Sequence, residues 1–583
     1  MKILTIHSDR LEVELKDKAI KDVEKGETGK ITEAENALVV FTAVEKGDKN
    51  DNETISESAV DEIEDIFNKV NAEEVVIYPY AHLSSNLSSP STAKQILEEM
   101  SELLEKKDIP SKRVAFGWYK RFDLNCKGHP LSELSRELKL EESKGMKKEQ
   151  IDDEKRKRLL KQISRSGLDT RKLEDNDHRI LGQKMNLFSF NDAAPGMVFW
   201  HDKGLKIYNE LVKYWREKHR KAGYEEISTP YILDEKLWKI SGHWDKYKDN
   251  MFSTEYEGRD MGVKPMNCPG GILVYKSDSK SYRDLPLKVA ELGTVHRKEL
   301  SGVLSGLFRV NYFTQDDAHV YCSEDDLKDE IKNIMDLIDD IYSKFNLSYK
   351  VKLATRPEER MGDDEIWDKA EAALKEMLES NDIEYEIAEG EGVFYGPKLE
   401  YHIEDSMDRT WQCGTIQLDF NMPEKFDLEY TGQDNDKHRP LMLHRAILGS
   451  LERFIGILLE HTNGRLPVWL APVQIRVLSL TDRNIEKSKE ILENIREMGI
   501  RADSDFASAT LSEKVRKAEV ERVPYTVVVG DKEEENGTIA VRKAWKDDVE
   551  YGIDPKEFIK NISEKIKQRK WSEEEKGVMR NKD

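Results

Sequence analysis

Residues 291–320 read ELGTVHRKELSGVLSGLFRVNYFTQDDAHV, and this stretch decides the fold of the region around it. Its apolar and β-branched residues predict one strand at 292–296 and a second at 310–314. A Gly/Ser-rich segment at 301–306 lies between them and is typical of a mobile loop. We therefore expect two strands that flank a loop and bring polar residues from both ends together.

The polar residues of this stretch fall into two chemical groups. Arg297 and Arg309 lie on either side of the loop. A guanidinium group is a flat, permanently charged fork of donors, which suits phosphate oxygens. His319 follows closely after Asp317, and a histidine beside an aspartate suits a metal ion or a polar substrate. The stretch thus predicts a nucleotide-binding site next to a metal site.

The composition restricts the class of protein. With 583 residues the chain is too long for one hydrophobic core, and about three or four domains are expected. Its four cysteines are too few for a disulfide framework, which favours a reducing compartment. No apolar run approaches the roughly 20 residues that a membrane span needs. The start, MKILTIHSDR, reads as a strand rather than a signal peptide, so we expect a cytoplasmic protein with no membrane partner.

The formal net charge of -22 argues against nucleic-acid binding over the whole surface, because such binding depends on Lys and Arg. Local basic patches can still override the total. They occur at 155–165 and 560–570, and on a predicted helix with Lys514, Arg516, Lys517 and Arg522. For the patch at 155–165 a solvated helix face and a contact with an RNA backbone both remain open.

The pattern of elements divides the chain into four parts. Residues 1–135 alternate strand and helix signals, and 136–175 form a charged linker without a sizeable apolar cluster. Residues 176–470 place a long helix before the strand YEEISTPYIL, whose Pro230 belongs at a sheet edge, and predict a mostly antiparallel sheet. Residues 471–583 alternate β and α, which indicates a largely parallel sheet. No GxGxxG or Walker lysine motif occurs.

Three residues suit a metal site although they are far apart in sequence. Cys268, His319 and His444 fit a three-ligand zinc site with an open fourth position, the pattern of catalytic zinc. None belongs to a CxxC or HxxxH pair. Each taken alone is better explained as a buried cysteine or a capping histidine.

Longer motifs carry a family resemblance. The loop with Arg297 and Glu299, the Pro230 strand and the segment 441–459 with Arg453 resemble motifs 2, 1 and 3 of class II aminoacyl-tRNA synthetases. Further segments, from about Asp177 onward, narrow the resemblance to threonyl-tRNA synthetases: SGHWDKYKDNMF, KPMNCPG, HRKELSG, RVNYFTQDDAHVY, FYGPKLE, WQCGTIQLDF and HRAILGSLERFIGILLEH.

This resemblance implies a multidomain α/β and α+β protein. Its parts would be a class II synthetase antiparallel-sheet catalytic core at 176–470, an N-terminal deacylase-like editing domain at 1–135 and a C-terminal α/β anticodon-binding domain at 471–583. The implied activity is ATP-dependent formation of threonyl-adenylate from L-threonine and its transfer to tRNA(Thr). Motif 1 implies a homodimer.

The resemblance also implies ligands for zinc and threonine. One Zn²⁺ per subunit would bind Cys268, His319 and His444 and hold the amino and hydroxyl groups of threonine. Valine is as large as threonine but has no hydroxyl group, so a site that must coordinate the hydroxyl rejects it. Asp317 would accept the hydrogen bond of that hydroxyl, and Gln315 and Tyr395 would line the pocket.

The same resemblance assigns residues to ATP and to transfer. The residues implied for ATP are Arg297, Glu299, Arg309, Gln412 and Arg453. Mg²⁺ is expected with the nucleotide because it neutralises charge on the leaving pyrophosphate. The catalytic residues implied are His243, Arg297 and Arg453. For His243 the family role is help in deprotonating the terminal ribose hydroxyl of tRNA, and the alternative is a structural histidine.

Zinc recognition cannot exclude serine, because serine also has an amino and a hydroxyl group. One missing methyl is worth only about 1–3 kcal/mol, so a second, hydrolytic site is expected. Residues 1–135 resemble the archaeal editing domain, which is similar to D-aminoacyl-tRNA deacylases. The matching residues are His82, Tyr119, Lys120 and Glu133, in AHLSSN, FGWYKRF and GHPLSELSR. Without this resemblance, His82 would be interpreted as a structural histidine.

Two departures and two alternatives complete the interpretation. Gly271 stands where bacterial forms have His, and Asn311-Tyr312 stands where Arg-Gly is usual; both border the site. A prolyl or seryl relative would lack the Cys/His/His set and QDDAH. A non-catalytic, synthetase-like RNA-binding or regulatory protein should have lost the phosphate arginines or the metal ligands, and all of them are present.

Overall fold

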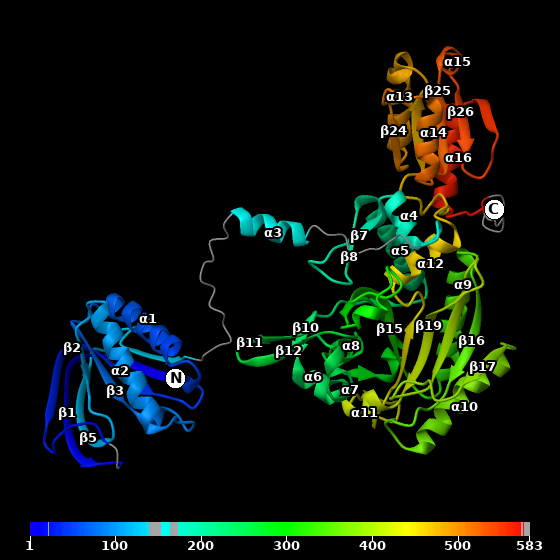
Figure 1. Ribbon diagram of the computed structural model, residues 1–583. Helices are drawn as coiled ribbons and strands as arrows, with labels where there is room; N and C mark the ends of the chain where they lie inside the picture. The colour runs from blue at the N-terminus through cyan, green and yellow to red at the C-terminus, as the bar shows by residue number, and fades with distance from the viewer. Residues whose placement is uncertain (21–22, 139–152, 164–172, 573–574, 576–583) are drawn as a thin grey trace. The chain divides into compact units, whose positions relative to one another are not determined.

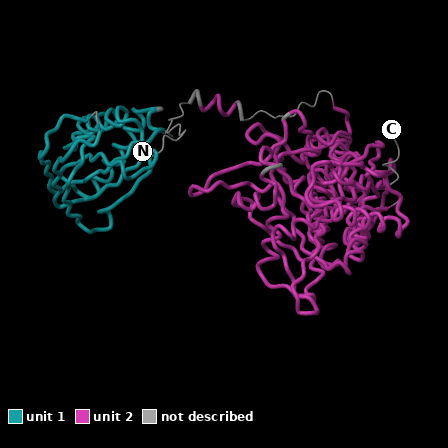
Figure 2. The backbone as a smooth tube through the Cα atoms, turned by 90° about the horizontal axis from the view of Figure 1, so that it is seen from below, with its two compact units in different colours: residues 1–152 teal, residues 153–583 magenta. Residues whose placement is uncertain are grey.

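The computed structural model describes residues 1–20, 23–138, 153–163, 173–572 and 575. It divides into two compact units, Met1–Asp152 and Asp153–Asp583, which are described separately (Figures 1 and 2). In the part of the predicted linker that is described, α3 (Asp153–Ile163) is helical. The rest of that linker, apart from its two ends, lies outside the described residues. A search of the described helices found none with the length and apolar character of a membrane span.

The first unit is a mixed sheet covered on one face by two helices (Figure 1). Its strand order is β4-β3-β2-β1-β5, with β6 also paired to β1. The strands are β1 (Lys2–Lys18), β2 (Ile31–Ala43), β3 (Glu74–Pro79), β4 (Ser111–Arg113), β5 (Trp118–Cys126) and β6 (Glu133–Glu137). The helices are η1 (Asp48–Asn50), α1 (Asn52–Val70), η2 (Ala81–Leu83) and α2 (Pro90–Lys106).

Alternation along the strands of this first unit gives its sheet two apolar faces. Leu38 and Val40 of β2 pack beneath α1 and α2. The intervening Val39 and Phe41 join a second cluster on the opposite face. The α2 helix begins at Pro90 because proline suits the first helical position, and Ser89 caps it by accepting the N–H of Thr92 at 3.3 Å.

The second unit contains an eight-stranded sheet in the order β17-β16-β18-β19-β22-β15-β14-β9. All pairs are antiparallel except β16–β17 and β14–β9, so the mostly antiparallel sheet predicted from the sequence is confirmed. The strands are β9 (Glu225–Glu226), β14 (Leu287–His296), β15 (Tyr312–Cys322), β16 (Ser348–Ala354), β17 (Tyr385–Ala388), β18 (Lys398–Glu404), β19 (Thr410–Asp419) and β22 (Leu441–Ala446).

The sheet separates a large helical core from a smaller cluster on its other face. Ala318 and Val320 of β15 pack on the helical side, whereas Tyr321 joins the cluster around Cys268. The helices of this half of the unit are α4 (His178–Lys184), α5 (Asp202–Lys221), α6 (Glu235–Ile240), α7 (His243–Tyr247), α8 (Cys268–Tyr275), α9 (Leu327–Lys344), α10 (Asp364–Ser380), α11 (Asn421–Lys425) and α12 (Leu451–His461). Cys268 and the residues packed around it therefore lie on the face of the sheet opposite the helical core.

Short elements complete this half of the unit. They are β7 (Phe188–Phe190), β8 (Val198–Trp200), β10 (Ile232–Asp234), η3 (Lys248–Asn250), β11 (Ser253–Tyr256), β12 (Arg259–Val263), β13 (Lys280–Ser281), η4 (Tyr282–Asp284), η5 (Ser301–Val303), β20 (Tyr430–Thr431) and β21 (Lys437–His438).

Two strand predictions are corrected here. The segment predicted as one strand with Pro230 is two, β9 and β10, which pair with different partners, β14 and β12. Proline has no N–H to donate, so the ladder breaks at Pro230. The strand predicted at 310–314 begins at Tyr312 and continues to Cys322. The polar residues of this strand suggest a loop in the sequence, but alternate ones, Gln315 and Asp317, line a cavity.

The C-terminal residues form a five-stranded sheet, β24-β23-β25-β26-β27. Only β24–β23 and β23–β25 are parallel, so the prediction of a largely parallel sheet is wrong for its other half. The short helix between β25 and β26 is too short for a crossover connection. The elements are β23 (Ile475–Ser479), η6 (Asp482–Asn484), α13 (Ile485–Glu497), β24 (Ala502–Asp505), α14 (Leu511–Val520), β25 (Tyr525–Val529), α15 (Asp531–Asn536), β26 (Ile539–Lys543), β27 (Val549–Ile553) and α16 (Pro555–Lys567).

The α5 helix is joined to the C-terminal residues by three ion pairs. They are Lys203–Glu521 at 2.6 Å, Glu210–Arg501 at 3.1 Å and Glu217–Arg569 at 2.7 Å. The α5 members recur two helical turns apart and therefore lie along one stripe of the helix. This stripe fixes the C-terminal part to the helix that precedes Pro230.

Candidate active site

One cavity of about 670 Å³ gathers most of the residues that the sequence assigned to chemistry. It opens on the sheet face opposite the helical core. The sequence-predicted residues that line it are His243, Cys268, Arg297, Glu299, Arg309, Gln315, Asp317, Tyr395, Gln412, His444 and Arg453. His319 adjoins it through its contact with His444.

Strand alternation explains how one short sequence supplies so many of these groups. Along β15, Gln315, Asp317 and His319 share a face because side chains alternate across a strand. The register pairs His319 with His444 of β22, directly across the ladder. The two imidazole rings lie with their centroids 4.9 Å apart.

Cys268, His319 and His444 form a group that suits a metal ion. One ligand atom from each lies within 4.8 Å of the others, and all three residues are buried. Nε2 of His319 is buried and, among the described residues, has no hydrogen-bond partner. A buried imidazole nitrogen without a partner is costly, and a metal ion would satisfy it. One thiol and two imidazoles are the donors that zinc prefers.

The surroundings of His444 support the same interpretation. Its Nε2 lies 2.8 Å from Oδ2 of Asp419, so Nδ1 is the ring nitrogen that remains for a metal ion. Oδ1 of Asp419 accepts the backbone N–H groups of Asn421 and Met422 at 2.8 and 2.9 Å. A carboxylate that orients a histidine in this way is the usual support of a metal ligand.

Burial also sets the protonation of this group. It lowers the pKa of His319 far below the usual value, so the imidazole is neutral, as metal binding requires. It raises the pKa of the Cys268 thiol well above its usual value. A thiol in such surroundings becomes a thiolate only beside a strong positive charge, such as a divalent metal ion.

The wall next to this group presents polar side chains in fixed positions. Nδ2 of Asn267 donates to Oδ2 of Asp317 at 3.3 Å, and the Tyr395 hydroxyl donates to Oε1 of Gln417 at 2.6 Å. Oε1 of Gln315 is buried without a partner among the described residues. Burial raises the pKa of Asp317 to about 6, so its carboxylate is still mostly ionised at neutral pH. These groups can bind a small polar ligand.

Three arginines also line the cavity. Nε of Arg297 donates to the Pro265 carbonyl at 3.0 Å, and its guanidinium lies 5.2 Å from the Phe313 ring centre. Arg309 pairs with Glu299 at 2.9 Å. Nη1 of Arg453 donates to the Gln412 carbonyl at 3.2 Å. Three guanidinium groups in one cavity suit a triphosphate.

The side-chain amide of Gln412 is held by a neighbour. Its Nε2 donates to Oε1 of Glu400 at 2.8 Å, so its orientation is set before any ligand binds. Arg453 also has a buried Nε without a partner among the described residues. The cavity thus contains both a fixed amide and an unsatisfied cationic donor on the phosphate side.

His243 is the first residue of α7, and its ring is fully buried. Its Nδ1 contacts the Ser241 hydroxyl at 2.8 Å, and its Nε2 has no partner among the described residues. Burial lowers the pKa of His243 to about 3, so the ring is neutral. Gly242 makes the preceding turn with a φ of 77°, a conformation that suits glycine.

The departures at 271 and 311 fit the site. A Cβ on Gly271 would lie 3.5 Å from Nδ1 of His319, so the position is close to the metal group. Oδ1 of Asn311 accepts the backbone N–H of Glu299 at 2.9 Å, and its Nδ2 donates to the Pro195 carbonyl at 2.9 Å. Asn311 therefore braces the backbone of Glu299 against the turn around Pro195.

Two buried acids were missed from the sequence. Asp316 accepts the backbone N–H groups of Ile447, Leu448 and Gly449 at 3.0, 2.9 and 2.9 Å. It faces the helical core and holds the turn that leads into α12. Glu452 accepts the Thr314 N–H at 2.9 Å, and burial raises its pKa to about 7. The only signal for Asp316 was its position, out of phase with Gln315 and Asp317.

In the first unit, rings connect two of the four predicted residues. Nζ of Lys120 lies 4.9 Å from the Tyr78 ring centre, the Tyr78 and Tyr80 rings are 6.0 Å apart, and Tyr80 and His82 are 5.3 Å apart. These residues border the sheet face without helices. Tyr119 points to the other side of β5 from Lys120 and is 64% exposed. The structure therefore brings Lys120 and His82 to one region and does not place Tyr119 beside them.

Glu133 is exposed in β6, where its Oε1 lies 3.5 Å from the Cys126 sulfur. The nearby ladder pairs Glu133 with Ile6. Burial lowers the pKa of Lys120 to about 8. An amine whose pKa is moved so close to neutrality is typical of a functional lysine, although burial alone also produces it.

Comparisons with known proteins agree with this architecture. Three family models match: an archaea-specific editing domain of threonyl-tRNA synthetase over residues 1–138, a tRNA synthetase class II core domain (G, H, P, S and T) over 252–462, and an anticodon binding domain over 470–565. The predicted fold class, an editing domain with a class II core and an anticodon-binding domain, is confirmed by these matches.

Curated relatives and solved structures point the same way. The threonine--tRNA ligase of Syntrophomonas wolfei is 52% identical over 399 residues, which cover 68% of this chain and 63% of that protein. The ligase of Carboxydothermus hydrogenoformans is 52% identical over 395 residues, covering 68% and 62%. The chain thus spans less than two thirds of the length of these relatives.

Two solved structures are similar over almost their whole length. One is the RNA binding domain of threonyl-tRNA synthetase from Cryptosporidium parvum, with a TM-score of 0.64 and 37% identity, covering 67% of this chain and 98% of that one. The other is a putative threonyl-tRNA synthetase from Aeropyrum pernix, with a TM-score of 0.61 and 31% identity, covering 70% and 97%.

Proposed function

This chain belongs to the threonyl-tRNA synthetase family, and from that premise we propose that it activates L-threonine with ATP and transfers it to tRNA(Thr). The observation that carries the proposal is one cavity that is lined by three arginines and adjoins a Cys/His/His group. A non-catalytic relative would not need both sets of residues. The test is formation of threonyl-tRNA(Thr), with AMP and pyrophosphate as the other products; its absence with folded, zinc-loaded protein would contradict the proposal.

Zinc is the metal that fits the donors. Cys268, His319 and His444 would hold one Zn²⁺ per subunit, with an open position for the substrate. When bound, zinc acts as a Lewis acid toward the amino and hydroxyl groups of threonine. Asp317, held by Asn267, accepts the hydrogen bond of the threonine hydroxyl, while Gln315 and Tyr395 line the pocket. Valine cannot satisfy these groups and is rejected.

Adenylate formation needs positioning and charge stabilisation more than acid or base chemistry. A carboxylate oxygen of threonine bonds to the α-phosphorus of ATP as the bond to the bridging oxygen breaks, and pyrophosphate leaves with that electron pair. Arg297 stabilises the charge that develops at the α-phosphate. Arg309, Arg453 and Mg²⁺ bind the other phosphates, while Glu299 and the fixed amide of Gln412 orient the nucleotide.

Transfer to tRNA requires removal of a proton from the terminal ribose hydroxyl. His243 is a candidate acceptor because its Nε2 is unpartnered among the described residues and the ring is neutral. The low pKa means that the imidazolium form is unfavourable. His243 therefore accepts a hydrogen bond from the hydroxyl and polarises it, while the proton leaves with the phosphate of the departing AMP as the ester bond forms.

Hydrolysis of seryl-tRNA(Thr) is assigned to the N-terminal residues, 1–135, because zinc cannot distinguish serine by its functional groups. Lys120 would orient the ester, and His82 would contact the nucleotide end. Tyr119 lies on the other side of β5, and Glu133 lies in β6 beside Cys126, so neither is assigned a contact with the ester. The hydroxyl of the tRNA ribose would assist. We retain 136–175 as a linker, 176–470 as the catalytic domain and 471–583 as the anticodon-binding domain.

Lys120→Met is expected to lower the deacylation of seryl-tRNA(Thr) at least about 100-fold, because the substituted side chain cannot orient the ester. The same variant is expected to be more stable at pH 7. The folded pKa of about 8 lies below the usual 10.5, so the charged form opposes folding by up to about 3 kcal/mol at pH 7, and stability rises as pH increases from 8 to 10.5. Thermal unfolding and deacylation rates measure both effects.

The control for Lys120→Met is Lys112→Met. Lys112 is an exposed lysine of β4 that pairs with Glu74 of β3. It should change neither deacylation nor the pH dependence of stability. A wild-type deacylation rate in Lys120→Met would contradict the assigned role, whatever its stability.

The C-terminal domain would bind the anticodon region of tRNA(Thr). The basic surface of the helix predicted there is smaller than expected. Lys514 is buried and donates to the Ser479 carbonyl at 3.1 Å, so it is not part of that surface. The exposed cations of the two predicted patches include Arg516, Lys517, Lys560, Lys567 and Lys570. They form basic islands on a chain of net charge -22, which repels RNA elsewhere.

Affinity for tRNA(Thr) is expected to fall steeply with salt, because each phosphate contact releases a counterion. Lys560→Gln combined with Lys567→Gln should lower the slope of log Kd against log salt by about 1 to 2. Lys328→Gln, on α9 of the catalytic part, should leave it unchanged. A slope near zero for the wild type, measured by filter binding or fluorescence anisotropy, would contradict direct phosphate contacts.

A homodimer through the edge of the eight-stranded sheet is supported by exposed apolar side chains near Pro230. Tyr231 is 56% exposed and Ile232 is 50% exposed, beside the two-residue edge strand β9. Light scattering of wild type and of Ile232→Glu tests this, because the charged side chain should weaken association. We place the activity in the cytoplasm, where tRNA and ATP are present, and the four cysteines are free thiols.

A further inference from the structure

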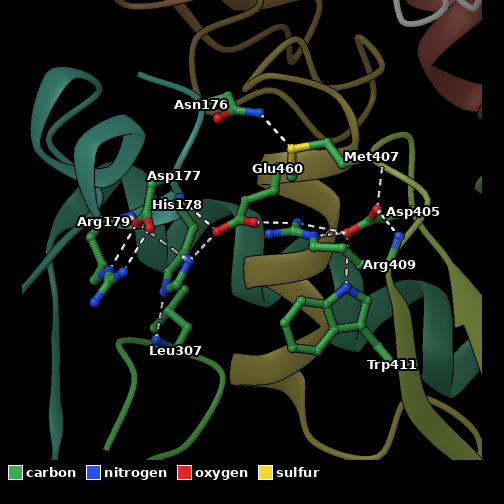
Figure 3. A network of polar contacts seen from close by, with 10 residues as sticks. All are labelled: Asn176, Asp177, His178, Arg179, Leu307, Asp405, Met407, Arg409, Trp411 and Glu460. Carbon is green, nitrogen blue, oxygen red and sulfur yellow. Dashed lines mark hydrogen bonds and ion pairs between the residues drawn. The ribbon is translucent and has the colours of Figure 1, made fainter. Parts of the chain in front are cut away.

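A buried polar network lies behind the phosphate wall, centred on His178 and Glu460 (Figure 3). His178 is the first residue of α4, and its ring is completely buried. Its Nδ1 lies 2.6 Å from Oε1 of Glu460, and its Nε2 accepts the backbone N–H of Leu307 at 2.9 Å. A backbone N–H can only donate, so Nε2 carries the lone pair and Nδ1 carries the proton. One neutral tautomer satisfies both partners.

The network does not need a metal ion to be satisfied. Asp177, His178 and Glu460 have ligand atoms within 4.8 Å of one another. However, Asp177 already binds Arg179 in a two-pronged pair, and Glu460 binds both His178 and Arg409. Cations and donors that the chain itself supplies therefore occupy the carboxylates.

The partner of Nε2 lies in the loop between Arg297 and Arg309. Gly306 has a φ of 51°, and a Cβ there would lie 2.2 Å from Nε2 of His178, so the imidazole packs directly on the loop backbone. The turn is closed by Phe308 N–H to the Ser305 carbonyl at 2.9 Å. Its conformation leads straight into Arg309, which lines the cavity.

Phe308 is held by the same network. Its ring centre is 4.2 Å from that of His178 and 4.2 Å from that of Trp411, so it lies between the two rings. Phe308 also lines the cavity. A shift of His178 would therefore move a side chain that borders the nucleotide, not only the loop behind it.

Glu460 connects this loop to the other two phosphate-side elements. It lies two helical turns after Arg453 on α12, so both face the same side of that helix. Glu460 also pairs with Arg409, which binds Asp405, and Asp405 accepts Nε1–H of Trp411 at 2.8 Å. Trp411 precedes Gln412 on β19. The segments that carry Arg309, Gln412 and Arg453 thus meet at one buried acid.

We propose that His178 is a positioning residue for ATP: through its hydrogen bond to Leu307 it sets the 305–309 turn that presents Phe308 and Arg309 to the nucleotide. This inference rests on the proposed function. His178 touches no substrate itself. Its loss should therefore weaken ATP binding and leave threonine binding intact, because the proposed threonine and zinc ligands on β15 and β22 are not members of the network.

Two substitutions of similar cost separate this role from general stabilisation. In His178→Gln the side-chain carbonyl reaches about the place of Nε2 and can accept the Leu307 N–H. In His178→Asn the amide reaches about the place of Nδ1 and keeps the bond to Glu460, but Leu307 loses its acceptor. Both variants lose the ring that packs on Phe308, so both should unfold at similarly reduced temperatures.

The experiment is ATP–pyrophosphate exchange with zinc-loaded full-length protein, together with calorimetric Kd values for ATP. His178→Asn should raise the KM and Kd for ATP about 10- to 100-fold with the KM for threonine within about twofold of wild type. His178→Gln should recover most of that loss. His461→Gln, a buried histidine next to Glu460 on α12, should leave both KM values unchanged.

Equal effects of Asn and Gln on ATP, or parallel rises in the KM for ATP and threonine, would overturn the positioning role. Failure of the proposed function looks different, because wild type would then show no threonine-dependent exchange. In that case the calorimetric Kd values for ATP still decide the inference by the same comparison of Asn with Gln.

Discussion

Cys268→Ala is expected to abolish stoichiometric zinc binding and to slow threonine activation about 1,000-fold. The substitution removes one of three protein ligands from a group whose atoms lie within 4.8 Å of one another. The pocket would then recognise threonine through Asp317 and Gln315 alone, without a Lewis acid to hold its hydroxyl and amino groups. The KM for ATP should change little, because the phosphate arginines do not belong to the metal group. Metal analysis and pyrophosphate exchange on the same preparation measure both quantities.

The matched control for this variant is Cys322→Ala. Cys322 is buried at the end of β15, the same strand that carries His319, but it does not line the cavity. It should lose some stability while retaining zinc and activity, since truncation of a buried side chain costs packing. A Cys268→Ala protein with one zinc per subunit and near-normal exchange would show that the Cys/His/His group is not the metal site.

Arg297→Ala is expected to lower the rate of threonyl-adenylate formation about 1,000-fold, or about 4 kcal/mol of transition-state stabilisation. Its guanidinium is held in the cavity by the Pro265 carbonyl and the Phe313 ring, so it is oriented before ATP binds. Arg297→Lys should recover only part of the loss, because an ammonium group keeps the charge but not the fork of donors. Single-turnover adenylate formation separates this step from product release.

Lys298→Ala is the control, because Lys298 is the adjacent, exposed residue and does not line the cavity. Its activity should stay within about twofold of wild type. An Arg297→Ala protein that forms adenylate at a normal rate but binds ATP weakly would contradict a transition-state role and leave only a binding role for this arginine.

The residues with proposed ligand roles could be named from the sequence because they belong to long motifs with a characteristic order. QDDAH, MNCPG and LHRAIL supplied the metal group, and HRKE with LERF supplied two of the arginines. Strand alternation then explains why Gln315, Asp317 and His319 share a face. The proposed ligand roles were therefore available from the sequence together with the family resemblance.

The residues that support the ligands were not predictable. Asp316 accepts hydrogen bonds from a turn more than a hundred positions away in sequence. Glu460 is hydrogen-bonded to His178, which is also far from it in the sequence. No local pattern signals such contacts, because they exist only after the sheet and α12 have packed. The same reason hid the burial of Lys514, which reads as part of a basic helix face but lies inside the domain.

The predicted ends of strands were wrong where backbone chemistry or function overrides the hydrophobic pattern. Pro230 splits the strand predicted around it, and the polar end of β15 reads as a loop although it runs on to Cys322. Active-site strands carry polar residues at positions that a structural strand would fill with apolar ones. The mixed topology of the C-terminal sheet was missed because β–α alternation does not reveal that α15 is too short to cross over.

One cavity is expected to activate threonine, tolerate serine and exclude valine. The most direct measurement is ATP–pyrophosphate exchange by the zinc-loaded chain with each of these three amino acids. We expect rapid exchange with threonine, exchange with serine about 10- to 200-fold less efficient, and none above background with valine. No exchange with threonine, or equal exchange with valine and serine, would contradict the claim.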